Sequence, residues 1–181
     1  MDKNYDMVAT TMFGLESVLE KELSQLGATN IKIGNRCVYF SGNKKVMYKA
    51  NVKLRTALKI LRNLSTFKAK KETELYKNIS KIKWDKIIDL SKTFSVSSTV
   101  NSKYFKHSNY VSLVTKDAIV DQFRKRYNNR PSIDLKNPDV NIHIHVSEHK
   151  CNLSLNSSGQ SLHKRGYRSK LFSAPMNEVL A

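Results

Sequence analysis

The sequence predicts an α+β protein that is built from two small units. Residues 5–64 alternate between short strand-like runs and helical stripes of apolar residues, and these two periodicities distinguish strands from helices. A polar run rich in lysine, residues 68–71, interrupts the pattern, and residues 72–155 then repeat the alternation. With 181 residues, the chain can form one ordinary domain or two small ones. We therefore expect two small packed domains.

The first unit is expected to open with a strand and a helix. Residues 6–10 have the composition of a short buried strand. In the helix that follows, Glu16 lies in the first turn, where the helix dipole favours negative charge, and Gly27 is a natural C-terminal stop. The apolar residues of this helix recur at a spacing that places them in one stripe: Leu15, Val18, Leu19, Leu23 and Leu26.

A hairpin, a second helix and a closing strand complete the first unit. Residues 30–33 and 36–40 predict two strands joined at Gly34–Asn35, where we expect the positive φ of a hairpin turn. Residues 44–51 favour a helix, and residues 58–64 favour a strand. The resulting order, β-α-β-β-α-β, is typical of a ferredoxin-like unit.

The second unit begins with a helix, a strand and another helix. Residues 72–82 predict the first helix, and residues 94–100 predict a strand by their β-branched alternation. Trp84 could stack on a base, but its place within helical apolar spacing favours a core anchor. Residues 110–128 predict a long helix. Its expected buried face comprises Val111, Val114, Ala118, Phe123 and Tyr127.

A half-exposed hairpin closes the second unit. Residues 140–146 alternate between apolar and polar side chains, and residues 153–155 continue the alternation after a turn at 148–150. A catalytic metal site in this hairpin would require a third ligand and acidic residues that hydrogen-bond to the ligands. The only acidic residue near in the sequence is Glu148. We therefore expect no metal and predict solvent-facing strand histidines. The histidines of this hairpin are His143, His145 and His149.

The charge of the chain favours a polyanionic ligand. Its formal net charge is +17, from 32 Lys and Arg against 15 Asp and Glu. The positive charge is grouped, because no acidic residue lies between Glu22 and Glu72 or between His149 and Asn177. Lysine outnumbers arginine about three to one, and codon usage alone can enrich lysine, so the arginines carry more weight. We expect a nucleic acid as the partner.

Several classes of protein are disfavoured. Cys37 and Cys151 make neither a disulfide framework nor a zinc-type Cys-x-x-Cys pair, and we expect buried thiols. The first residues show no apolar stretch behind a basic start, so we expect no signal peptide, and no run approaches the ~18 apolar residues of a membrane span. The expected location is the cytoplasm. Because no nucleophile–base pair and no glycine-rich loop after a strand stand out, we assign no catalytic residue to this chain.

Basic residues interleaved with aromatic ones indicate where RNA would bind. Residues 101–110 carry both kinds between a strand and a helix, so rings can stack on bases while ammonium groups meet phosphates. The alternative is a surface loop with one aromatic side chain beneath it. A second cluster ends the long helix, where the dipole already favours cations. The candidate RNA-binding residues are Lys103, Tyr104, Lys106, His107, Lys116, Arg124, Arg126, Arg130, Arg55, Arg62, His163, Lys164, Arg165, Tyr167 and Arg168.

The last part of this set lies in a basic stretch near the C-terminus. Residues 161–168 read Ser-Leu-His-Lys-Arg-Gly-Tyr-Arg, with a glycine that permits a sharp turn and arginines that suit phosphate. The alternative for this stretch by itself is a solvated basic linker. Ala174–Pro175 follows, ahead of Glu178. This arrangement resembles the junction in THUMP-containing RNA guanine-N2 methyltransferases, although Met176–Asn177 replaces the apolar and basic pair expected there.

The start of the chain is also similar to that family. A strand at 5–11 runs into Gly14-Leu15-Glu16 and a helix that ends at Leu26–Gly27. The resemblance implies a ferredoxin-like domain at 1–67, an RNA-binding THUMP domain with a mixed sheet at 68–168, and a linker with the start of a catalytic domain at 169–181.

For function, the resemblance implies the RNA-binding part of an enzyme that methylates guanine N2 of large-subunit ribosomal RNA. S-adenosylmethionine would be the cofactor of the whole enzyme, bound outside these residues, and neither a membrane nor a protein partner is expected. Two alternatives remain. In the first alternative, the chain is a free-standing RNA-binding or ribosome-associated module without catalysis. In the second, it is the THUMP module of a tRNA-modifying enzyme. DNA is a weaker alternative, because no helix-turn-helix or zinc-finger pattern is present.

Overall fold

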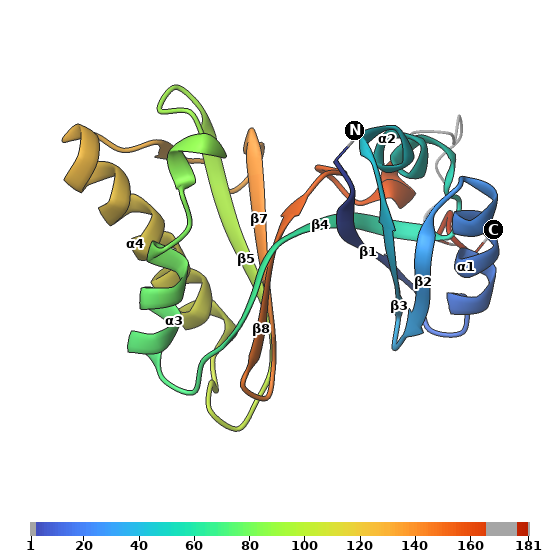
Figure 1. The fold of residues 1–181 in the computed structure, drawn as a ribbon, viewed down its shortest axis with the longest axis horizontal. Coiled ribbons are helices and arrows are strands. Elements are labelled where there is room, and N and C mark those ends of the chain that lie inside the picture. The colour runs from blue at the N-terminus through green and yellow to red at the C-terminus, as the bar shows by residue number, and fades with distance from the viewer. Residues whose placement is uncertain (1–2, 166–176, 181) are drawn as a thin grey trace, which may run out of the picture. The chain divides into compact units, whose positions relative to one another are not determined.

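The computed structural model describes residues 3–165 and 177–180, which belong to two compact units (Figure 1). Unit 1 comprises residues 1–63 and 156–181, and unit 2 comprises residues 64–155. The chain therefore leaves unit 1, builds unit 2 and returns to unit 1. The domain boundaries expected from the sequence, at 67/68 and 168/169, remain predictions.

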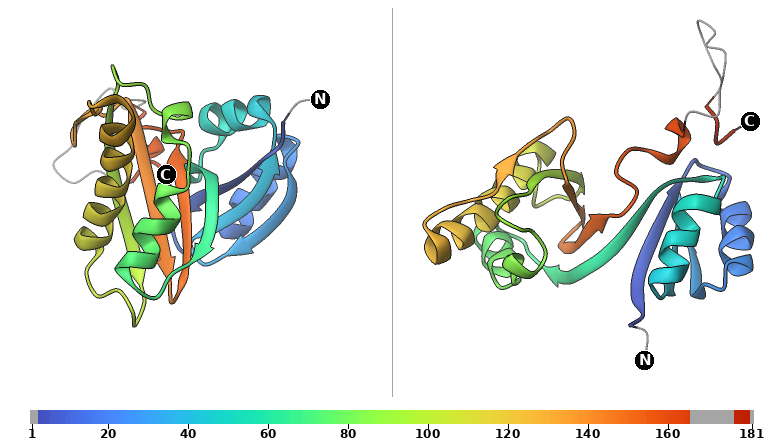
Figure 2. Two further views of the ribbon diagram at one scale, coloured as in Figure 1. Left: turned by 60° about the vertical axis from the view of Figure 1, so that its left-hand side comes forward. Right: turned by 90° about the horizontal axis from the view of Figure 1, so that it is seen from above.

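Unit 1 has the expected β-α-β-β-α-β order. Its hydrogen-bonded strand order is β2-β3-β1-β4, and β1 is antiparallel to both β3 and β4. The two helices cover one face of this sheet (Figures 1 and 2). The prediction of a ferredoxin-like unit is confirmed. Its elements are β1 (Tyr5–Thr11), α1 (Glu16–Gln25), β2 (Thr29–Gly34), β3 (Cys37–Gly42), α2 (Lys44–Lys53) and β4 (Ala57–Lys68), followed near its end by the short helix η2 (Leu162–Lys164).

The core of unit 1 forms where α1 and α2 meet the sheet. Leu19 and Leu23, one helical turn apart, are fully buried against strand residues such as Phe40. The prediction that Val18 shares this stripe is wrong, because its side chain is 44% exposed. An α-helix turns by about 100° per residue, so Val18 falls beside the stripe that Leu19 and Leu23 define.

The hairpin of unit 1 turns one residue later than expected. The residue with positive φ is Arg36, at 55°, and Gly34 is not in that region. Gly34 serves a different purpose, because a Cβ atom there would lie 2.8 Å from Cys37 Sγ and 2.8 Å from the Tyr39 ring. Its hydrogen atom leaves room for the side chains of the opposite strand.

Unit 2 is a mixed sheet with helices on one face (Figure 1). The strand order from the end of β4 is β4-β8-β7-β5-β6, and β5 is parallel to both β6 and β7. The two-residue connection from β7 to β8 makes these strands an antiparallel hairpin. The expected mixed sheet is confirmed. The elements are α3 (Glu72–Ser80), η1 (Trp84–Lys86), β5 (Thr93–Asn101), α4 (Ser108–Tyr127), β6 (Ser132–Ile133), β7 (Val140–Ser147) and β8 (Lys150–Asn156).

Trp84 is the core anchor that the sequence predicts. Its side chain is fully buried, and its indole N–H donates to the Ile79 carbonyl at 3.0 Å. Gln122 of α4 accepts the Trp84 backbone N–H at 2.9 Å, so the tryptophan is held from two helices. The predicted buried face of α4 is right for Val111, Ala118 and Phe123, Val114 is half-buried, and Tyr127 is exposed. Tyr127 is the last residue of the helix, and Phe123 is the last of its buried residues.

No helix within residues 3–165 and 177–180 combines the length and the apolar character needed to cross a membrane.

Candidate nucleic-acid interface

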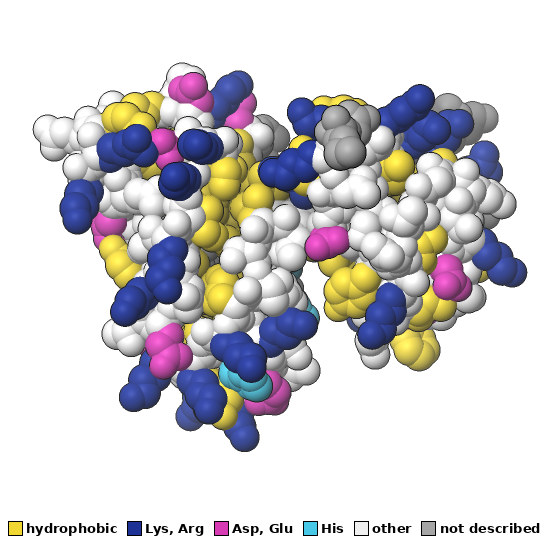
Figure 3. All heavy atoms as spheres, viewed as in Figure 1, with side chains coloured by type: hydrophobic (Ala, Val, Ile, Leu, Met, Phe, Trp, Pro, Cys, Tyr) yellow, Lys and Arg dark blue, Asp and Glu magenta, His cyan; other side chains and the backbone are white. Residues whose placement is uncertain are grey.

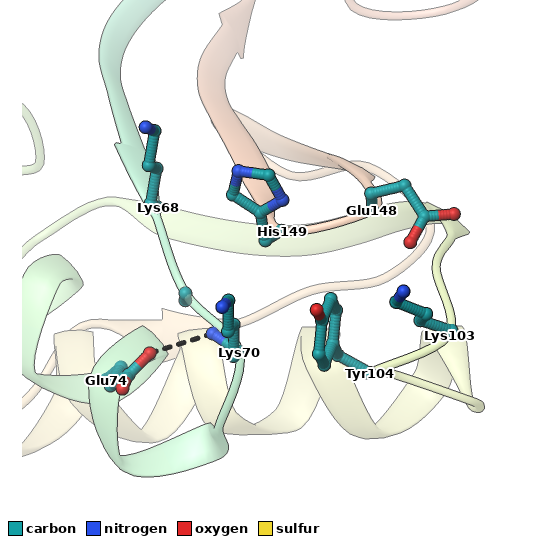
Figure 4. Close-up of a pocket in the computed structure, with 8 residues that line it drawn as sticks. Lys68, Lys70, Glu74, Lys103, Tyr104, Glu148 and His149 are labelled. Carbon is teal, nitrogen blue, oxygen red and sulfur yellow. Dashed lines mark hydrogen bonds between the residues drawn. The ribbon is translucent and has the colours of Figure 1, made fainter.

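A groove of about 690 Å³ lies at one end of the unit 2 sheet (Figure 4). Three segments distant in sequence form it: the end of β4 with the residues after it, the loop from β5 to α4, and the turn between β7 and β8. We call it the unit 2 groove. It is lined by Lys68, Ala69, Lys70, Glu74, Lys103, Tyr104, Glu148 and His149.

Hydrogen bonds tie these three segments together. The Ser102 hydroxyl donates to the Glu148 carbonyl and accepts the Tyr104 N–H at 3.0 Å. The Glu148 N–H donates to the Asn101 carbonyl at 2.8 Å, and the Ala69 N–H donates to the His149 carbonyl at 2.9 Å. The walls of the groove are therefore joined through the backbone, which preorganises the side chains they carry.

Tyr104 lies at the centre of the positive charge in the unit 2 groove. Its side chain is 37% exposed, and its ring centroid lies 5.7 Å from Lys70 Nζ and 5.4 Å from Lys103 Nζ. The next residue, Phe105, is 5% exposed and packs into the core of unit 2, which anchors the loop. Figure 4 shows the Tyr104 ring between these two lysines. A ring flanked by ammonium groups can stack on a base while the cations meet the adjoining phosphates.

The acidic residues of the groove have defined local roles. The Glu74 carboxylate accepts the Lys70 backbone N–H at 2.8 Å, as the dashed line in Figure 4 marks. Glu148 adopts a positive φ of 50° at the β7–β8 turn, which its backbone needs in order to reverse the chain. The lining therefore combines Lys68, Lys70 and Lys103 with two carboxylates, one of which is engaged with the backbone.

The sequence identifies Lys103 and Tyr104 but misses the other half of the groove. In the sequence, Lys68 and Lys70 are assigned to the polar run between the two units. His149 is considered only as a metal ligand. The available signal is that Lys68 and Lys70 close the acid-free stretch that ends at Glu72. What brings them to Tyr104 is the pairing of β4 with β8, a long-range contact.

Other candidates of unit 2 lie outside the groove lining. Lys106 and His107 are exposed in the same loop. Arg126 is engaged within the unit, since its guanidinium contacts the Asp85 carboxylate at 2.6 Å. Lys116 contacts Asp117 at 2.7 Å, Arg124 lies 3.9 Å from Asp121, and Arg130 is exposed after the helix ends. Part of this basic cluster therefore serves intramolecular ion pairs, which at the surface contribute little to stability.

The remaining candidates belong to unit 1. Arg165 donates from its guanidinium to the carbonyls of Asn51, at 2.7 Å, and Val52, at 3.3 Å. The Arg62 guanidinium lies 5.1 Å from the Tyr5 ring, while Arg55 and Lys164 are exposed. The His163 ring nitrogen Nδ1 lies 2.8 Å from the Ser161 hydroxyl. Tyr167 and Arg168 lie outside the described residues.

Histidine and cysteine side chains do not assemble into a further site in the described part of the chain. No three His, Cys, Asp or Glu side chains there come together as metal ligands. The His143 ring lies 3.0 Å from the Ser97 hydroxyl, and burial lowers the pKa of His145. Burial raises the pKa of the Cys151 thiol to about 11, which keeps it protonated at neutral pH. Cys37 is half-buried, and burial raises its pKa also.

Comparison with known proteins assigns both halves of the chain. Residues 6–61 match the RlmL ferredoxin-like domain, and residues 69–156 match the THUMP domain. The slr0064 protein of Synechocystis sp., named provisionally as an RNA methyltransferase, is 40% identical over 173 residues. The ribosomal RNA large subunit methyltransferase K/L of Syntrophotalea carbinolica is 34% identical over 181 residues.

A solved structure is also similar. SMU.472, described provisionally as a methyltransferase and crystallised as a complex with SAH, has 28% sequence identity and a TM-score of 0.81 over 99% of this chain. The alignments cover 96% and 100% of this chain for the Synechocystis and Syntrophotalea proteins, but only 45% and 25% of those proteins. This chain likewise covers 48% of SMU.472. It therefore spans about half, or less, of the length of these relatives.

Fold and sequence agree on the assignment. The β2-β3-β1-β4 sheet of unit 1 corresponds to the ferredoxin-like match, and the mixed sheet of unit 2 corresponds to the THUMP match. The resemblance drawn from the two ends of the sequence is confirmed. The chain belongs to the THUMP-domain proteins, and it pairs its THUMP domain with a ferredoxin-like domain of the RlmL type.

Proposed function

We propose that this chain is the RNA-binding part of an S-adenosylmethionine-dependent methyltransferase that acts on guanine N2 of large-subunit ribosomal RNA. The observation that carries the RNA-binding role is the unit 2 groove, where Tyr104 lies between Lys70 and Lys103. The relative from Syntrophotalea carbinolica supports ribosomal RNA as the substrate. We propose guanine N2 as the methylated atom because the Arg-Gly-Tyr-Arg and Ala-Pro segments resemble those of the RNA guanine-N2 methyltransferases.

The groove offers binding chemistry for RNA. Ammonium groups neutralise phosphates and release their counterions, which makes the affinity depend on salt concentration. An exposed tyrosine ring adds stacking on an unpaired base, a contact that duplex RNA does not offer because its bases are already stacked. A structured RNA with an unpaired segment therefore fits the groove better than a blunt duplex. We place the protein in the cytoplasm with this RNA.

The cofactor belongs to the whole enzyme. The chain has no glycine-rich turn after a strand that would cradle S-adenosylmethionine. We therefore propose that residues outside this 181-residue chain hold it. The likeness to SMU.472, which was crystallised as a complex with SAH, supports this class of cofactor for the whole enzyme. The role of this chain would be to hold the RNA so that a guanine reaches that cofactor.

The groove is tested with the paired substitution Lys70→Gln and Lys103→Gln. Removing two ammonium groups should lower the slope of log affinity against log salt by about one unit for each phosphate that is no longer neutralised. The measurement is fluorescence anisotropy of a labelled RNA hairpin with a single-stranded 3′ tail, across a salt series. Tyr104→Ala should weaken binding by about 1–3 kcal/mol, and Tyr104→Phe should retain it, because stacking needs the ring and not the hydroxyl.

A matched control is Lys77→Gln with Lys81→Gln. These exposed lysines lie at the C-terminal end of α3 and are not among the groove residues. The control removes the same charge from the same unit, so it should change the salt slope less. Equal effects of the two pairs would mean that RNA responds to net charge only, and the groove would lose its role.

A further inference from the structure

Helix α2 of unit 1 carries a second group of side chains suited to RNA. Its ten residues include four lysines and no acidic residue. One stripe at helical spacing joins the exposed Lys45, Tyr48 and Val52 with the half-buried Lys49. Tyr48 is 62% exposed and Val52 is 71% exposed, so an aromatic ring and an apolar side chain lie open among cations. We call these residues the α2 stripe.

The helix is electrostatically unfavourable by itself. Lys44 and Lys45 occupy its first turn, where the helix dipole disfavours positive charge. Lys45 and Lys49 are like charges four residues apart, as are Lys49 and Lys53, and such pairs destabilise an isolated helix. Among the described residues, no carboxylate forms an ion pair with a lysine of α2. The lysines of the first turn and the like-charge pairs therefore favour an anion as a ligand of this helix.

The rest of the helix is built to stay in place. Ala50 is fully buried in the core of unit 1, with Val46 and Met47 packed against that core. The Asn43 side chain caps the N-terminus by accepting the Val46 N–H at 3.0 Å. Because one face is anchored, the opposite face is presented on a rigid element. Figure 3 shows Lys and Arg side chains gathered along the top of unit 1, the side on which Figure 1 places α2.

We propose that the α2 stripe is a second RNA-binding surface, which takes a single-stranded segment with phosphates on Lys45 and Lys49 and a base stacked on Tyr48. This inference rests on the proposed RNA-binding function, but on residues of a different unit from the groove. Charge complementarity identifies the ligand as a polyanion, and the exposed ring selects RNA with unpaired bases. Val52 extends the apolar surface on which that base would lie.

The test is the pair Lys45→Gln and Lys49→Gln in the 181-residue chain, compared with Lys77→Gln and Lys81→Gln. Both pairs have the same spacing and remove the same charge. The α2 pair should weaken binding of the tailed RNA hairpin on the order of tenfold at about 0.1 M salt and lower the salt slope by about one to two units. Its melting temperature should stay unchanged or rise, because the substitutions relieve repulsion.

Tyr48 gives an independent readout. Tyr48→Ala should weaken binding of the tailed hairpin but not of a blunt RNA duplex of the same length, and Tyr48→Phe should restore the tailed hairpin to its original affinity. Equal losses for tail and duplex would remove the stacking role and overturn the proposed ligand.

The outcomes separate this inference from the proposed function. If the unsubstituted chain binds neither RNA, both proposals fail. If it binds and the Lys70/Lys103 pair matters while the α2 pair does not, only the α2 stripe is rejected. If the α2 pair leaves RNA affinity unchanged but reduces binding to phosphatidylserine–phosphatidylcholine vesicles, the surface is a lipid contact and the inference is overturned.

Discussion

Neighbouring residues in the loop from β5 to α4 have opposite roles. Phe105 is buried in the core of unit 2, while Tyr104 lies open in the groove beside Lys103. The buried Phe105 agrees with the interpretation of a surface loop that covers one aromatic side chain, while RNA binding by the exposed Tyr104 stays a prediction. The Ser102 hydroxyl accepts the backbone N–H groups of both Tyr104 and Phe105, which fixes the course of the chain at these two residues.

The burial of His145 predicts that the stability of unit 2 depends on pH. Burial holds its folded pKa below the ordinary value of 6.5, so the unfolded chain binds the proton more readily. The contribution of neutral His145 to the free energy of unfolding should be fully present at pH values above 6.5. It should be lost as the pH falls below 6.5 toward the folded pKa. His145→Gln should flatten the fall, as measured by urea unfolding across a pH series.

The exposed His107 provides the comparison for this measurement. His107→Gln is the matched control, because it makes the same substitution at an exposed side chain, and His145→Gln should change the pH profile more. A His145→Gln profile as steep as the original would show that another group is responsible.

At the scale of elements, a ten-residue segment at 156–165 returns to unit 1 and holds α2 and β4. The Ser157 N–H donates to the Ile60 carbonyl at 2.9 Å, and Ser158 Oγ donates to the Asn51 side chain at 2.7 Å. The guanidinium of Arg165 then contacts the last turn of α2. A cation near a helix C-terminus is favoured by the dipole, so this candidate RNA ligand has a structural role in the described residues.

Substituting Arg165 tests that role. Arg165→Ala should lower the local stability of the last turn of α2 by about 1–2 kcal/mol, because it removes charge-assisted hydrogen bonds to two carbonyls. The readout is hydrogen exchange of the Leu54 amide, which donates to the Ala50 carbonyl at 3.2 Å. Lys164→Ala, the exposed neighbour, should leave that exchange rate unchanged. Unaltered exchange in Arg165→Ala together with weaker RNA binding would instead assign Arg165 to the RNA.

At the scale of the whole molecule, positive charge is spread over surfaces of both units. The groove lies in unit 2 and the α2 stripe in unit 1, and each combines lysines with an exposed tyrosine. If both surfaces bind as proposed, an RNA that reaches both would be held more tightly than by either one, through effective concentration. This suits a large structured RNA better than a short oligonucleotide.

The methyltransferase proposal is tested on the protein purified from its natural host. With S-adenosylmethionine and unmodified large-subunit ribosomal RNA, it should form N2-methylguanosine, detected by mass spectrometry of the digested RNA. The Lys70→Gln and Lys103→Gln pair should raise KM for the RNA more than it lowers kcat, because the groove holds RNA and not the methyl group. RNA binding without any methylated guanosine would favour a module that serves another activity.

The sequence by itself determined the two fold types, the buried Trp84, the family and the order of the elements apart from β6, η1 and η2. These depend on periodicity, local turn chemistry and short motifs, which are properties of neighbouring residues. The tertiary structure decided which basic residues share a surface: it brought Lys68 and Lys70 to Tyr104, paired Arg126 with Asp85, and turned Arg165 toward α2. The physical reason is that strand pairing and helix packing join residues far apart in the chain, and a pattern along the sequence does not record that distance in space.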